Sequence, residues 1–75
     1  MVDTFKLFDV VALTTDLPDD GLYRGQVGTI VEIYSPDVFE VEFVEHNTDY
    51  TYALNTVKSS QAMLLHYAPV EKSST

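Results

Sequence analysis

Cysteine is absent from the chain of 75 residues, and so is any long apolar run. Without cysteine, no disulfide can stabilise the core, and a zinc site built on thiolates is excluded. No apolar run approaches the roughly 20 residues of a membrane-spanning helix, and the N-terminus lacks the basic and apolar segments of a signal peptide. We therefore expect a soluble, cytoplasmic protein that makes no membrane contact.

Basic residues are scarce: Lys and Arg number 4 against 12 Asp and Glu, which gives a formal net charge of −8. They are scattered along the sequence, at Lys6, Arg24, Lys58 and Lys72. Nucleic-acid-binding proteins concentrate such residues to displace counterions from phosphates, so we expect no nucleic acid as a partner. The acidity either keeps the protein soluble or offers an acidic surface to a basic partner.

No segment keeps a helical period, whereas five short runs have the composition of β-strands. We predict strands at about 9–13, 26–34, 38–44, 50–54 and 62–66, a polar loop over 14–23, and at most one helical turn within 55–61. Phe5 and Phe8, ahead of the first strand, are expected to pack. The prediction is all-β: one five-stranded, strongly bent SH3-like barrel over residues 1–67, followed by a flexible C-terminal tail over 68–75.

Gly25 and Gly28 stand three residues apart at the entry to the second predicted strand. Glycine tolerates the positive φ of tight turns and bulges, so the pair indicates a sharp turn into a curved strand. No Gly-Lys-Ser/Thr follows, which excludes a phosphate-binding loop.

Phe39, Val41 and Phe43 alternate with two glutamates, which is the pattern of a half-buried strand with a defined inner face. The short connections 35–37 and 46–49 then set the register of the neighbouring strands. The predicted inward pairs are Ile33 with Phe39, Val31 with Val41, Thr29 with Phe43, Phe43 with Tyr52, and Val41 with Leu54.

On the outer face, the same register sets Glu32 directly opposite Glu40, with Glu42 one pair further along, beside Ile30. The fourth strand is expected to add Thr51, Ala53 and Asn55 to this face, none of them cationic. The glutamates therefore form either a solvated polar face or a docking surface for Lys and Arg groups.

Aromatic residues offer a second candidate surface. Tyr23, Tyr34 and Tyr67 are expected to be partly exposed and could form an aromatic binding patch. The candidate partner-binding residues are thus Glu32, Glu40, Glu42, Tyr23 and Tyr34.

Residues that could carry chemistry are few and poorly spaced. His46 and His66 match no metal-ligand pattern, even with acidic residues nearby. The aspartates of the polar loop, Asp16, Asp19 and Asp20, lack the ligand order and the closing glutamate of an EF-hand. No serine lies in a nucleophile elbow, and paired glutamates need a deep cleft for glycoside cleavage, for which so small a domain has little room. We expect no catalytic residue, no metal site and no cofactor: the protein is not an enzyme.

Four ordered segments, residues 7–13, 16–18, 22–32 and 39–43, resemble a family of small bacterial proteins catalogued as domain of unknown function 4926. The resemblance covers roughly residues 7–65 and implies a small SH3-like barrel, with no established activity or catalytic residue. The segment from Gly25 to Glu32 also resembles the KOW element of ribosomal and transcription-elongation proteins, and the SH3-like domain of nitrile hydratase β subunits. The basic residues with which KOW domains contact RNA are missing here.

The sequence thus favours a non-enzymatic interaction module, an acidic SH3-like barrel that binds a basic protein partner in an antitoxin-like or accessory role. The alternative is a KOW-type, nucleic-acid-associated regulator, which a continuous basic stripe would favour. A homodimer is also expected, because so small a β-domain leaves strand edges and aromatic side chains uncovered.

Overall fold

The computed structural model describes residues 4–45, 47–48 and 50–66. The strands are β1 (Val10–Leu13), β2 (Val27–Ser35), β3 (Val38–Val44), β4 (Thr51–Lys58) and β5 (Ala62–Leu64), with 3₁₀ turns at η1 (Pro18–Asp20) and η2 (Ser59–Gln61). The all-β, five-stranded prediction is confirmed. β4 is longer than predicted, since residues 55–58 continue the strand, and the predicted tail lies outside the described residues.

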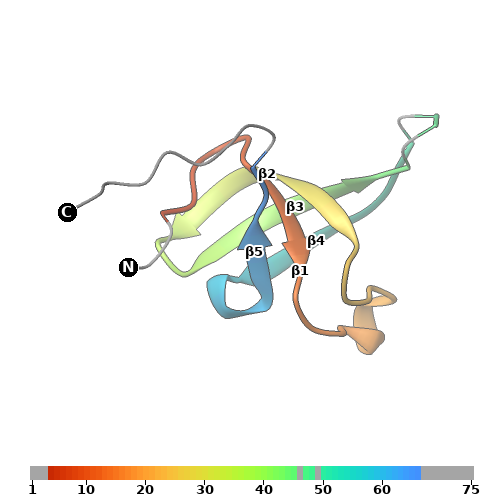
Figure 1. The fold of residues 1–75 in the computed structure, drawn as a ribbon, viewed down its shortest axis with the longest axis horizontal. Helices are drawn as coiled ribbons and strands as arrows, with labels where there is room; N and C mark the ends of the chain where they lie inside the picture. Colours follow the sequence, from red (N-terminus) through yellow and green to blue (C-terminus); the bar gives the residue numbers. More distant parts are fainter. Residues whose placement is uncertain (1–3, 46, 49, 67–75) are drawn as a thin grey trace.

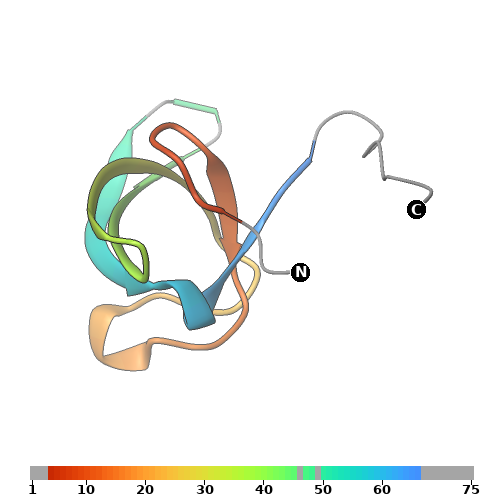
Figure 2. The ribbon, with the colours of Figure 1, turned by 90° about the vertical axis from the view of Figure 1, so that its left-hand side faces the viewer.

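The strands form one antiparallel sheet in the order β4-β3-β2-β1-β5, so β4 and β5 are its edges. Figure 1 shows β2, β3 and β4 as long twisted strands and β1 and β5 as a short pair that crosses them. From the side, the sheet curls strongly round the core (Figure 2). The strong bend that the sequence predicted is therefore present.

Two β-bulges bend β2. Its register with β3 shifts between Ile30 and Glu32, and again between Ile33 and Ser35. Each bulge places one extra residue on β2, which increases the local twist and curves the strand. The curved strand predicted from the glycine pair is confirmed.

The first bulge makes part of the predicted register wrong. Ile33 lies opposite Phe39, as expected. Beyond the bulge, Val41 pairs with Ile30 instead of Val31. Likewise, Phe43 pairs with Gly28 instead of Thr29. A regular two-residue alternation does not include the extra residue, so every pair beyond it moves by one position.

β4 is displaced from its predicted register in the same way. The register shifts between Phe43 and Val44, which makes Tyr52 an extra residue on β4. Phe43 pairs with Ala53 instead of Tyr52, and Val41 pairs with Asn55 instead of Leu54. The ring of Tyr52 nevertheless lies 6.2 Å from that of Phe43. The predicted contact therefore exists, although the predicted pairing does not.

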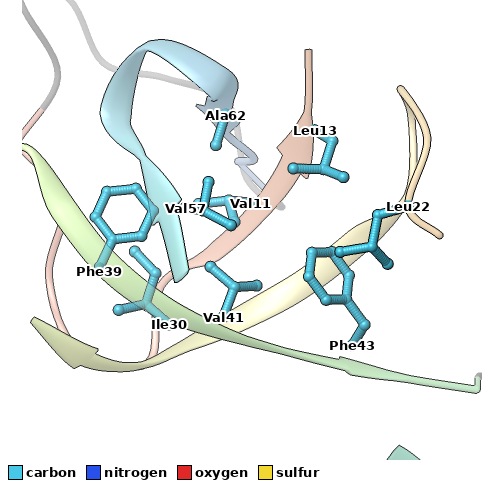
Figure 3. Packing of buried hydrophobic residues seen from close by; sticks show 9 residues of the cluster. All are labelled: Val11, Leu13, Leu22, Ile30, Phe39, Val41, Phe43, Val57 and Ala62. Carbon is cyan, nitrogen blue, oxygen red and sulfur yellow. The ribbon is translucent and has the colours of Figure 1, made fainter. Parts of the chain in front are cut away.

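The core lies on the inner side of the bent sheet (Figure 3). Its buried members are Val11, Leu13, Leu22, Ile30, Phe39, Val41, Phe43, Val57 and Ala62. All five strands contribute, and Leu22 comes from the loop between β1 and β2. Burying one such large side chain is worth about 1.5–3 kcal/mol, so this cluster supplies most of the stabilisation available to so small a domain.

The two aromatic residues ahead of β1 have different environments. The ring of Phe5 packs 4.9 Å from that of Phe39, as expected. The expected packing of Phe8 is wrong, because its side chain is 72% exposed. The turn from Lys6 to Asp9 holds Phe8 at φ 70°, and the backbone N–H of Phe8 donates to the carbonyl oxygen of Ile30 at 2.7 Å. This turn directs the side chain away from the core.

Gly25 and Gly28 shape the entry to β2 for different reasons. Gly25 has φ 94°, in the left-handed region, and its N–H donates to the carbonyl of Leu13 at 2.8 Å. At Gly28, an added Cβ would lie 2.5 Å from Cγ1 of Val41 and 2.8 Å from the carbonyl oxygen of Glu42. The first glycine permits the turn, and the second permits the close approach of β3.

Candidate functional site

A cluster of glutamates lies on the outer side of the β2–β3 hairpin. We call it the acidic face and define it by Glu32, Glu40 and Glu42. Glu32 lies directly opposite Glu40, as predicted. Glu42 lies opposite Thr29 instead of beside Ile30, because the bulge between Ile30 and Glu32 shifts the register. Like charges in a cross-strand pair destabilise a sheet by about 0.2–1 kcal/mol, so the hairpin tolerates a repulsive pair.

Hydroxyl groups donate hydrogen bonds to these carboxylates. The Tyr34 hydroxyl donates to Oε1 of Glu40 at 3.2 Å, and the Thr56 hydroxyl donates to the same oxygen at 2.9 Å. The Thr51 hydroxyl donates to Oε2 of Glu42 at 2.7 Å. Because these donors are neutral, they orient the carboxylates and leave the negative charge in place.

β4 supplies other residues to this face than the sequence predicted. Thr51 lies on it, as expected, but Ala53 and Asn55 pair with inward-facing residues of β3. Leu54 and Thr56 take their places, opposite Glu42 and Glu40 respectively. The side chain of Leu54 is 57% exposed, so an apolar group borders the acidic face.

Tyr34 is the aromatic member of this surface. Partial desolvation of its hydroxyl, then the charge of Glu40 and the hydrogen bond to it, and last the charge of Glu32, raise the pKa of Tyr34 above its ordinary value of 10.0. With 59% of the side chain exposed, solvent limits the size of this effect. At neutral pH Tyr34 keeps its proton and remains a hydrogen-bond donor to Glu40.

Tyr23 does not belong to the acidic face. It precedes β2, whereas Tyr34 lies near the other end of that strand. The backbone N–H of Tyr23 donates to Oε1 of Gln26, and Nε2 of Gln26 donates to the Tyr52 hydroxyl at 3.2 Å. The structure therefore separates Tyr23 from the other predicted site residues and brings it to the start of β4. Tyr67 lies outside the described residues.

A second aromatic group, which the sequence prediction missed, results from this contact. We call it the tyrosine patch and define it by Tyr23, Tyr50 and Tyr52. Tyr50 and Tyr52 stand two residues apart, Tyr50 directly ahead of β4 and Tyr52 as the extra residue of the bulge in β4, and both are exposed. The Tyr-x-Tyr spacing was the available signal, and the predicted inward register of Tyr52 concealed it.

A comparison with family models decides the relationship of the chain. The model described as a domain of unknown function (DUF4926) matches residues 7–64. The chain belongs to the DUF4926 family. The match spans β1 to β5 and confirms the resemblance noted in the sequence. Searches of curated proteins and of solved structures gave no match. The description of DUF4926 names no activity.

Across residues 4–45, 47–48 and 50–66, His, Asp and Glu side chains form no group of three or more that could hold a metal ion. His66 is exposed, and His46 lies outside these residues. Over the same ranges, no helix has the length and apolar character needed to cross a membrane.

Proposed function

We propose that this DUF4926 protein is a non-enzymatic protein-interaction module whose acidic face docks a basic partner protein. The arrangement at Glu40 carries the proposal. Its carboxylate lies opposite Glu32 and accepts hydrogen bonds from the hydroxyls of Tyr34 and Thr56. A sheet that needed only stability would gain from a cation at one of the paired positions. The chain instead keeps both negative charges and fixes one of them in position.

The acidic face also offers acceptors to a cation from outside. Both hydroxyls donate to Oε1 of Glu40, so within the described residues Oε2 of this carboxylate receives no hydrogen bond. Among the same residues, Glu42 accepts a hydrogen bond at Oε2 and none at Oε1. Lys and Arg groups of a partner can donate to these oxygens, and such charge-assisted hydrogen bonds are roughly twice as strong as neutral ones.

The charge of the whole chain supports the same proposal. A formal net charge of −8 attracts a positively charged protein at long range, which raises the rate of association more than the final affinity. The exposed side chain of Leu54 beside Glu42 adds apolar contact area to the same surface. A basic partner with a small apolar group at its contact surface fits this arrangement.

Quantitative affinity capture tests the proposal. Three baits are immobilised in equal amounts at low ionic strength: the parent chain, the Glu40→Gln/Glu42→Gln variant, and Glu45→Gln. The control removes one negative charge just beyond the end of β3, where Glu45 accepts a hydrogen bond from Thr48. We expect a basic protein that the parent and the control retain and that the double variant loses. Equal retention of every captured protein by all three baits would contradict the proposal.

A further inference from the structure

The tyrosine patch lies at the opposite end of β2 from Tyr34 and plays no part in the proposed docking at the acidic face. Its side chains are largely exposed: Tyr23 by 51%, Tyr50 by 67% and Tyr52 by 42%. They come from two parts of the chain, the loop between β1 and β2 and the start of β4. Exposed tyrosines gathered from separate elements provide large, rigid contact area at low conformational-entropy cost.

Two hydrogen bonds hold the loop against β4. Gln26 joins the backbone of Tyr23 to the hydroxyl of Tyr52, and Nδ2 of Asn55 donates to Oδ2 of Asp20 at 3.1 Å. Within the loop, Leu17 and Leu22 form an isolated antiparallel bridge that closes the η1 turn. The surface is therefore built before any ligand arrives, which lowers the ordering cost of binding.

The hydrogen bonds also determine what the patch can offer a ligand. The Tyr52 hydroxyl accepts from Nε2 of Gln26, so its own proton remains available for a carbonyl oxygen. The loop that carries Tyr23 also carries three aspartates, Asp16, Asp19 and Asp20. Oδ1 of Asp16 is held by the backbone N–H of Arg24 at 2.9 Å. Arg24 is the single basic residue of residues 14–26, so negative charge prevails there.

We infer that the tyrosine patch binds an extended, arginine- or lysine-bearing segment of a partner protein. The chain of that segment passes over the rings, the Tyr52 hydroxyl donates to one of its backbone carbonyls, and its cations lie over a ring face or beside the aspartates. The negative charge selects the occupant, because an acidic or neutral segment lacks the complementary cations. The inference is independent of the acidic face and holds whether or not that face docks a partner.

Chemical-shift mapping with two synthetic peptides tests the inference. The first probe is a blocked ten-residue peptide of alternating arginine, proline and leucine, and the second is its twin with glutamate at each arginine position. We expect the arginine peptide to shift the amide resonances of Tyr23, Gln26 and Tyr52, and the glutamate twin to leave them unchanged. Equal shifts with both peptides, shifts confined to Glu32, Glu40 and Glu42, or no shifts with either peptide would overturn the inference.

Three variants separate the patch from general attraction by charge. Tyr52→Phe keeps the ring and removes one hydrogen-bond donor, so the arginine peptide should bind roughly threefold to tenfold more weakly. Tyr23→Ala should weaken binding further, because it removes a ring. Phe8→Ala, which truncates an exposed aromatic side chain outside both surfaces, is the control and should leave binding unchanged. Weakening by Phe8→Ala as large as that by Tyr23→Ala would contradict the assignment.

Discussion

At the scale of single residues, Gly25 and Gly28 differ in what an added methyl group would meet. At Gly25 no atom lies within 4 Å of the new Cβ, and the cost comes from holding alanine at φ 94°. At Gly28 the new Cβ meets Val41 and the backbone of β3. We expect Gly25→Ala to destabilise by about 1–2 kcal/mol and Gly28→Ala by about 1–3 kcal/mol, as measured by thermal melts.

The Val41→Ala background distinguishes the two causes. Removing Cγ1 of Val41 makes room at Gly28, so Gly28→Ala should cost less in this background than in the parent. Gly25→Ala should cost the same in both, because its strain is in the backbone. If the two glycine variants respond alike to Val41→Ala, the explanation by crowding at Gly28 is wrong.

The pKa of Tyr34 gives a second prediction at this scale. Desolvation, Glu40 and then Glu32 raise this pKa above 10.0, so Glu40→Gln should lower it towards 10.0, while Glu45→Gln should not change it. The unfolded chain releases the Tyr34 proton near pH 10, before the folded protein does. Stability from this group is therefore complete below pH 10 and is lost as the pH rises through the folded pKa. Ultraviolet titration of the tyrosinate band in each variant measures the change.

At the scale of elements, the register of β4 decides which of its side chains are buried. Val57 is fully buried opposite Phe39, whereas Leu54 is 57% exposed. We expect Val57→Ala to destabilise by about 2 kcal/mol and Leu54→Ala by no more than about 0.5 kcal/mol in chemical denaturation. A larger effect at Leu54 than at Val57 would support the regular register without the bulge at Tyr52.

The elements themselves follow from local patterns. Alternation of apolar residues and glutamates predicts β3 with its observed bounds, Val38–Val44. The Asp-Gly and glycine signals predict the loop at η1 and the bend in β2. The predicted connection 35–37 is wrong, because Ser35 ends β2 and pairs with Val38. Glu32 still lies opposite Glu40, as predicted, because the extra residue at Tyr34 offsets the shorter turn.

Bulges explain most of what the sequence did not reveal. A bulged residue has no distinctive composition, since Val31 and Tyr52 are ordinary strand residues. Each of them moves the neighbouring pairs by one position. The prediction, which assumed a regular register, therefore placed Val31 and Leu54 wrongly on the inner side. The tyrosine patch was missed because it depends on contacts of Gln26 with Tyr23 and with the distant Tyr52, which periodicity cannot supply.

At the scale of the whole molecule, the charge of −8 leads to two expectations about partners. Nucleic acid should not bind at physiological salt, and a gel-shift assay with RNA and DNA below about 1 μM measures this. Salt-dependent binding in that range would favour the KOW-type alternative.

The second expectation is a homodimer, which stays a prediction. The edge strands β4 and β5 can pair across a two-fold axis once salt screens the repulsion between the negatively charged chains. Light scattering at high concentration and moderate salt measures it, and a monomeric mass there would contradict it.

The central claim is that the acidic face has a role in binding that its effect on stability does not explain. Association rates of the parent and of Glu40→Gln/Glu42→Gln with the captured partner, measured at two ionic strengths beside a thermal melt, test it most directly. We expect the variant to be as stable as the parent or slightly more stable, because repulsion is relieved. Its association should be slower, with the larger difference at low salt. An unchanged association rate at both ionic strengths would contradict the claim and remove the acidic face from the function.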